Sequence, residues 1–144
     1  MRDSLRKNTV RVESRSQGTG FFIGRNGTLL TCFHVIGDVD TGEVTDPAPR
    51  IIFHDTEYQA RVVRLSPLPS LLDVAVLQLA EERLPDDAAL LPLAAWQEDW
   101  RQSRIVSFGF RPPKDPDGLF AHGKISGRID TKSGGRVLQL QSQP

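Results

Sequence analysis

The sequence GTGFFIGRNGTLLTCFHVI, at residues 18–36, decides how the rest of the chain is interpreted. Two apolar runs, 20–24 and 28–31, flank Arg25-Asn26-Gly27, and an Asn-Gly pair favours the positive φ angles of a tight hairpin turn. His34 follows the second run, so we expect an imidazole at the end of a strand. An imidazole can accept and return a proton near neutral pH.

Alternating and β-branched runs predict further strands on both sides of this hairpin. Before residue 80, the predicted strands are 9–13, 20–24, 28–31, 50–53, 58–65 and 74–79. After residue 100, the predicted strands are 104–110, 123–129 and 136–141. Short strands at regular spacing are typical of a barrel or sandwich, so the pattern predicts an all-β protein with one complete and one incomplete barrel-like unit.

Composition excludes several classes of partner and cofactor. The 144 residues contain 18 Lys plus Arg and 18 Asp plus Glu, so no global positive charge favours nucleic acid or anionic lipid. The single cysteine cannot form an internal disulfide, and no Cys/His cluster has the spacing of a structural zinc site, so no metal or cofactor is expected. No apolar run suits a signal peptide or a membrane span, and we expect a cytoplasmic protein without nucleic-acid or membrane partners.

The strand Gly18-x-Gly20-Phe21, followed by Leu30-Thr31-x-x-His34-Val35, resembles the trypsin-like serine peptidases, particularly their bacterial and intracellular branch. The segment Asp73-Val74-Ala75-Val76-Leu77 is similar to the family's segment that carries the acid of the catalytic triad. The resemblance implies a chymotrypsin-like double β-barrel in which the first barrel is complete and the second is incomplete. It also implies the catalytic residues His34, as general base, and Asp73, as the acid that orients the imidazole. From the residues alone, a strand-end histidine and a turn aspartate remain alternatives.

The resemblance further implies peptide-bond hydrolysis in a protein or peptide substrate. Residues 1–144 are then expected to form the N-terminal part of the peptidase domain, with a first barrel at about 8–80, a connector at 81–103 and the start of a second barrel at 104–144. The alternative is a catalytically inactive trypsin-like fold that acts as a protein-binding module.

The family's Gly-x-Ser-Gly-Gly/Ala-Pro segment, which supplies the nucleophile, has no match in this sequence. Ser133-Gly134-Gly135 is the nearest sequence, but Thr131 stands where the family has glycine and Arg136 stands where it has proline, so we interpret it as a hairpin turn. Ser142 has no glycine neighbours and is expected at the exit of a strand. We therefore expect the nucleophile in a C-terminal remainder of the peptidase, from the same gene or a second chain.

Cys32 is expected to be a small buried thiol that fills the barrel. In an extended segment, Cys32 and His34 would share a face without converging on a common atom. Phe33 departs from the small residue that is common at its position in the family.

The remaining histidines and the tryptophans are interpreted as structural. His54 and His122 are predicted to be surface turn residues. Trp96 and Trp100 are predicted to be packing anchors of the connector, with a helical turn near Trp96.

Overall fold

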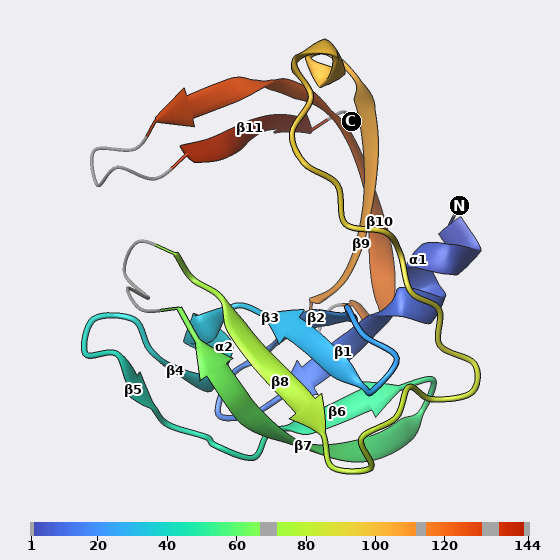
Figure 1. Cartoon of the computed structure of the whole chain (residues 1–144). Helices are drawn as coiled ribbons and strands as arrows, with labels where there is room; N and C mark the ends of the chain where they lie inside the picture. The colour runs from blue at the N-terminus through green and yellow to red at the C-terminus, as the bar shows by residue number, and fades with distance from the viewer. Residues whose placement is uncertain (1, 67–71, 112–114, 131–135, 143–144) are drawn as a thin grey trace.

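The structure is a computed structural model that describes residues 2–66, 72–111, 115–130 and 136–142. Figure 1 shows a barrel and a second sheet that rises beside it and arches over it. The elements in chain order are α1 (Arg2–Asn8), β1 (Thr9–Glu13), β2 (Gln17–Phe22), β3 (Thr28–Thr31), α2 (Phe33–Ile36), β4 (Gly37–Asp38), β5 (Glu43–Val44), β6 (Arg50–Phe53), β7 (Thr56–Leu65), β8 (Ala75–Leu79), η1 (Glu98–Trp100), β9 (Arg104–Arg111), β10 (Asp115–Asp130) and β11 (Arg136–Ser142).

The barrel is closed, antiparallel and ordered β1-β2-β3-β8-β7-β6. The pairing of β1 with β6 completes the ring, so every barrel strand has a hydrogen-bonded neighbour on both sides. A register shift between Val62 and Arg64 of β7 marks a β-bulge, which increases the local bend that a closed sheet needs. The prediction of a complete first barrel is confirmed.

Alternate residues of the barrel strands fill its interior. Val10 and Val12 of β1 are completely buried, as are Phe22 and Leu29 on the strands that follow. Phe22 also makes an edge-to-face contact with Phe53, with ring centroids 5.7 Å apart. Each such side chain contributes about 1.5–3 kcal/mol through its burial, and together they hold the strands that carry the candidate site.

The turn between β2 and β3 lies where the sequence predicts it. The backbone N–H of Gly27 donates to the carbonyl of Gly24 at 3.1 Å, and Gly27 has a φ of +78°. A β-carbon there would lie 2.8 Å from the carbonyl oxygen of Arg83, so glycine is also required for space. Asn26 contributes differently from the prediction, since its side-chain oxygen accepts a hydrogen bond from the Thr28 hydroxyl at 2.7 Å.

The second sheet has the order β11-β10-β9, and it does not close into a barrel within the described residues. Its middle strand, β10, is much longer than the predicted strand 123–129. His122 lies within β10, opposite Val106, so its prediction as a turn residue is wrong. The error arose because Gly118, at a φ of +90°, is accommodated inside the strand rather than ending it.

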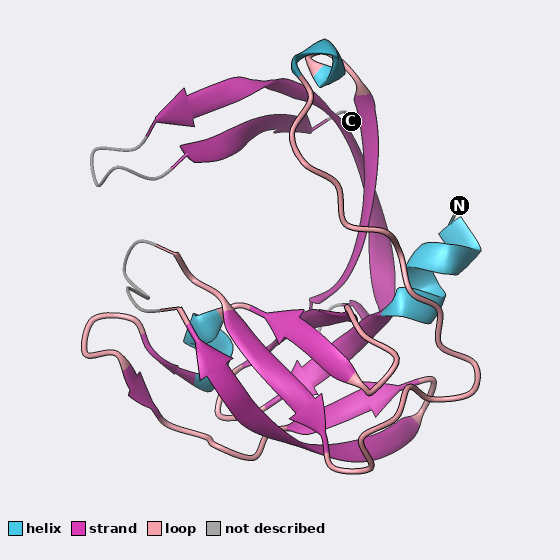
Figure 2. Ribbon diagram, viewed as in Figure 1, coloured by secondary structure: helices cyan, strands magenta, loops and turns pink. Residues whose placement is uncertain are grey.

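Helix α1 was not predicted from the sequence, and it connects three parts of the molecule (Figure 2). The Asn8 side chain donates to the backbone carbonyls of Phe22 and Ala89, both at 2.9 Å. The guanidinium of Arg6 lies 5.1 Å from the ring centroid of Phe120 on β10. The helix therefore joins the barrel, the connector and the second sheet. No helix among the described residues has the length and apolar character needed to cross a membrane.

The connector carries the predicted helical turn and aromatic pair. η1 ends at Trp100, and the rings of Trp96 and Trp100 meet edge to face with centroids 6.2 Å apart. Arg128 of β10 lies over Trp96, 5.7 Å from its centroid. Trp96 thus packs the connector against the second sheet, and the contact between the two rings agrees with their prediction as packing anchors of the connector.

Candidate active site

His34 projects from α2, a short helix that follows β3 directly. The residues beside His34 fix the helix to the core, because Phe33 and Ile36 are completely buried and Val35 is nearly so. A backbone hydrogen bond from Val35 to the carbonyl of Cys32 closes the turn at 3.2 Å. With its neighbours facing the core, the imidazole faces outward, and its side chain is 58% exposed.

Strand pairing brings Asp73 to the same place. In the antiparallel register of β3 and β8, Thr31 lies opposite Ala75. Moving forward from Thr31 toward His34 therefore corresponds to moving backward from Ala75 toward Asp73. The two residues are 39 apart in sequence, yet their side chains meet at the same end of the barrel.

Asp73 holds His34 with both carboxylate oxygens. Its Oδ2 lies 2.5 Å from Nδ1 of the imidazole, and its Oδ1 accepts the backbone N–H of His34 at 2.8 Å. The hydrogen bond to the His34 backbone was not predicted, because the pattern of side chains in a sequence does not indicate which backbone N–H groups a carboxylate will accept from. An ionised carboxylate at Nδ1 favours the tautomer with a proton on Nδ1, which leaves the lone pair of Nε2 directed away from Asp73. The arrangement suits a general base.

The prediction for Cys32 is wrong, since the residue is exposed. Phe33, and not Cys32, fills the barrel at this point. The physical reason is that the chain leaves the extended conformation after Cys32 and enters α2, so the alternation of a strand no longer applies. One donor atom each from Cys32, His34 and Asp73 lie within 4.8 Å of one another, which also contradicts the prediction that Cys32 and His34 do not converge. Desolvation, and secondly the charge of Asp73, raise the pKa of the Cys32 thiol.

Of the two candidate serines, only Ser142 lies within the described residues. Within the described part of the chain, the hydrogen bonds of the His34 side chain go to Asp73 and to no serine. Ser133-Gly134-Gly135 lies outside the described residues. Ser142 ends β11, in agreement with its prediction as a strand exit.

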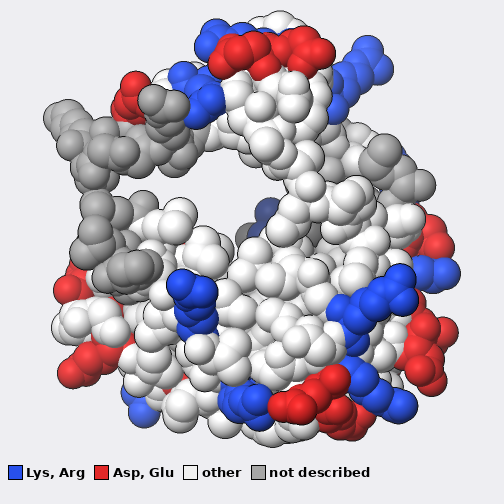
Figure 3. Space-filling view, in the orientation of Figure 1, with Lys and Arg blue, Asp and Glu red and all other residues white. Residues whose placement is uncertain are grey.

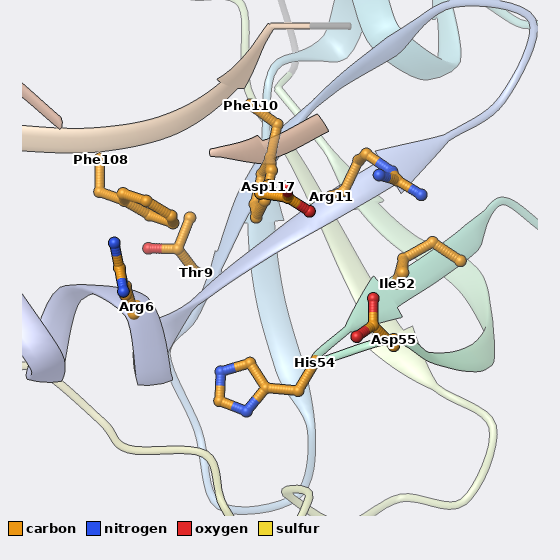
Figure 4. Close-up of a pocket in the computed structure, with 9 residues that line it drawn as sticks. All are labelled: Arg6, Thr9, Arg11, Ile52, His54, Asp55, Phe108, Phe110 and Asp117. Atoms are coloured by element: carbon orange, nitrogen blue, oxygen red, sulfur yellow. The ribbon is translucent and has the colours of Figure 1, made fainter. Parts of the chain in front are cut away.

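A pocket of about 320 Å³ lies elsewhere, among α1, β1, the β6–β7 turn and the second sheet (Figure 4). The pocket is lined by positively and negatively charged side chains and by His54. Neither His34 nor Asp73 lines it. His54 lies in the β6–β7 turn at a φ of 45° and stacks on Phe53, so its prediction as a surface turn residue is confirmed. Figure 3 shows charges of both signs around the visible face and no patch of a single sign.

A family model of the trypsin-like peptidase domain matches residues 18–144. The chain belongs to the trypsin-like peptidase family. The matched part begins at Gly18 and contains both His34 and Asp73. No curated protein matches the sequence.

Solved structures of proteases share the fold of this trypsin-like peptidase chain. Deg5 matches with a TM-score of 0.67 and 20% identity, over 98% of this chain and 70% of that one. The active form of the Rv3671c protease from M. tuberculosis matches with a TM-score of 0.65 and 19% identity, over 94% of this chain and 58% of that one. Its inactive form matches with a TM-score of 0.63 and 20% identity, over 88% and 56%. At these identities the likeness shows the fold, and the chain spans less than two thirds of the length of the Rv3671c protease.

Proposed function

We propose that this chain is the acid- and base-bearing part of a serine endopeptidase that hydrolyses peptide bonds in protein substrates. The observation that carries the proposal is the contact of Asp73 Oδ2 with His34 Nδ1 at 2.5 Å. Membership of the trypsin-like peptidase family supports a protein as the substrate. The outward position of the imidazole supports a substrate that approaches from solvent.

The proposed mechanism assigns each group a proton-transfer role. His34 accepts the proton of a serine hydroxyl at Nε2 while the serine oxygen attacks the scissile carbonyl carbon. Asp73 stabilises the resulting imidazolium and keeps its Nδ1–H oriented. The imidazolium then donates its proton to the leaving amine, and a water molecule, activated in the same way, hydrolyses the acyl-enzyme. The second hydrogen bond of Asp73, to the backbone of His34, keeps the carboxylate in place during both transfers.

We further propose that the nucleophilic serine comes from a C-terminal remainder of the peptidase. Ser133 is followed by two glycines, but it lacks the preceding glycine and following proline of the family's nucleophile segment. The second sheet is not closed within the described residues, which leaves a place for further strands.

A second function, as a binding module that performs no catalysis, is favoured by one observation. Among the described residues, the hydrogen bonds of the His34 side chain include none to a serine. In that case the protein would bind a polypeptide without cleaving it.

Labelling with a fluorophosphonate probe tests the proposal, because the probe reacts with a serine that an adjacent base activates. The experiment compares three proteins: the 144-residue chain, the longer peptidase polypeptide, and the longer polypeptide with His34→Ala. We expect the longer form to be labelled and to cleave a fluorescent casein substrate, and the His34→Ala variant to lose both. His122→Ala is the matched control, because His122 is an exposed histidine on β10.

Labelling of the longer form that persists in His34→Ala would overturn the role of His34. Cleavage by the 144-residue chain that Ser133→Ala abolishes would overturn the assignment of the nucleophile to the remainder. A longer form that binds polypeptides but is never labelled would favour the binding module.

A further inference from the structure

Cys32 has no role in the proposed peptidase mechanism, yet its thiol lies close to both His34 and Asp73. Its thiol, the imidazole of His34 and the carboxylate of Asp73 each place a donor atom within 4.8 Å of the other two. Cys32 and His34 are exposed and Asp73 is half-buried, so an ion can reach the cluster from solvent. Thiolate, imidazole and carboxylate are the three protein ligands that zinc binds most often.

We propose that Cys32, His34 and Asp73 bind one zinc ion that reversibly disables the general base. The binding part of this inference stands on the donor atoms alone. The inhibitory part rests on the proposed peptidase function. Three protein ligands leave the fourth position of a tetrahedral ion to water.

The distances define how the side chains must move. Two nitrogen or oxygen ligands of one tetrahedral zinc ion lie about 3.4 Å apart, given zinc–ligand bonds of about 2.0–2.2 Å. The 2.5 Å contact between Asp73 Oδ2 and His34 Nδ1 is therefore too short to hold an ion. Zinc must replace that hydrogen bond, and the two side chains must separate by about 1 Å. Their exposed fractions, 58% for His34 and 38% for Asp73, leave room for this rotation.

The backbone keeps the three ligands close while the side chains adjust. The β3–β8 register places the segment before Ala75 beside the segment after Thr31. The hydrogen bond from the His34 backbone to Asp73 Oδ1, at 2.8 Å, does not involve the imidazole and can persist with zinc bound. The site is thus largely assembled before the ion arrives.

The binding step involves no redox change. The Cys32 thiol loses one proton to solvent and binds zinc as a thiolate, and Asp73 binds as a carboxylate. The neutral imidazole binds through one ring nitrogen and keeps its single proton on the other nitrogen. Neither nitrogen then has a lone pair available for a serine proton, so the base is disabled until a chelator removes the ion.

Binding can be measured on the 144-residue chain without any activity. Zinc titration against a chromogenic zinc indicator should give one zinc ion per chain, and Cys32→Ala should bind at least about tenfold more weakly. Cobalt(II) is a spectroscopic substitute, and we expect a thiolate-to-cobalt charge-transfer band that Cys32→Ala lacks. His122→Ala is the matched control and should retain both properties, since His122 lies on the second sheet.

A second variant, Asp73→Asn, tests the same zinc site independently in case Cys32→Ala does not fold. Asparagine can still accept the backbone N–H of His34 through its side-chain oxygen, but it lacks the negative charge by which a carboxylate strengthens zinc binding, so weaker binding is expected again. Circular dichroism should show that both variants are folded. Folded Cys32→Ala that binds zinc as tightly as the unaltered chain, or a cobalt complex without the charge-transfer band, would overturn the inference.

The inhibitory part is tested on the longer, active polypeptide. Zinc should reduce its cleavage of casein, and EDTA should restore it. The ratio of rates with and without zinc should be much closer to one in Cys32→Ala than in the unaltered enzyme. If no form shows activity but the 144-residue chain binds zinc through Cys32, the proposed function fails and the zinc site stands. If activity is present and zinc affects Cys32→Ala equally, the zinc inference fails and the peptidase stands.

Discussion

Gly18 of β2 lies against Val35 of α2 so closely that a β-carbon on the glycine would stand 2.5 Å from Val35 Cγ2. Val35 follows His34 and is nearly buried, so β2 forms part of the surface on which the helix rests. The first glycine of the Gly-Thr-Gly sequence is therefore required by the packing of the helix that carries the candidate base. Its role is spatial, because it does not have a positive φ.

Gly18→Ala should destabilise the fold by about 1–3 kcal/mol, because the added methyl group must displace Val35 or the helix. Urea unfolding followed by circular dichroism measures this change. Gly127→Ala is the matched control: a β-carbon there has its nearest neighbour, a side-chain nitrogen of Arg101, at 4.0 Å. Equal effects of the two substitutions would contradict the packing argument.

Thr19→Val should weaken the connection between the barrel and the second sheet. The Thr19 hydroxyl accepts the backbone N–H of Phe110 at 2.8 Å, and valine cannot replace this acceptor. An amide left without its acceptor in a partly buried position costs about 1–3 kcal/mol. Hydrogen exchange at the Phe110 amide should accelerate, whereas Thr41→Val, which affects only an exposed contact to Glu43, should leave it unchanged.

Under the proposed function, Asp73→Asn should lower the turnover of the longer peptidase polypeptide by about 10⁴-fold, because the amide favours the wrong tautomer of His34. The 144-residue chain itself offers a second readout. A strongly hydrogen-bonded Nδ1–H should give a low-field proton resonance in NMR spectra, and Asp73→Ala should remove it. A resonance that survives this substitution would show that the imidazole proton is held by another group.

Trp96→Phe should raise the pKa of the Glu98 carboxyl toward its ordinary value. In the folded chain this pKa is lowered, first by the hydrogen bond from the Trp96 indole at 2.9 Å and also by Arg101. The stabilising effect of that carboxylate is present above its ordinary pKa and is lost as the pH falls through its lowered folded-state pKa. NMR titration of Glu98 measures the change, and Trp100→Phe should leave the titration unaltered.

Leu140→Lys should reduce self-association of the 144-residue chain. Within the described residues β11 is paired on one side only, by β10, and its Leu138 and Leu140 side chains are 46% and 57% exposed. An unpaired strand edge beside apolar side chains recruits another strand, and a lysine there opposes such pairing. Size-exclusion chromatography with light scattering should show oligomers of the unaltered chain. A folded monomer with strong amide protection along β11 would contradict the prediction.

The barrel strands could be predicted because each has a strong local signal. Turn residues bound most of them, and apolar residues at alternate positions indicate which face is buried, as in β1 with Val10 and Val12. The pair His34 and Asp73 could be predicted as neighbours only through the family resemblance, since no periodicity relates residues that far apart. Strand register, rather than sequence spacing, brings them together.

The errors lie where tertiary contacts override the local pattern. Helix α1 has little apolar character of its own and is held by Asn8 and by Arg6, whose partners are distant in sequence. The exposure of Cys32 depends on the residue at which β3 ends and α2 begins. A shift of this boundary by one residue decides whether Cys32 or Phe33 is the buried side chain. Such boundaries are the least predictable property of a sequence.

All strands of the closed barrel end by Leu79, and both His34 and Asp73 precede that residue. Synthesis on the ribosome proceeds from the N-terminus, and domains fold as their residues emerge. The candidate pair of His34 and Asp73 can therefore be assembled while β9, β10 and β11 are still untranslated. The later sheet then docks onto the barrel through contacts that include the hydrogen bond from the Phe110 backbone N–H to the Thr19 hydroxyl. Under the proposed function, folding in this order gives the nascent chain its candidate proton acceptor before any nucleophile that depends on the second sheet can be positioned.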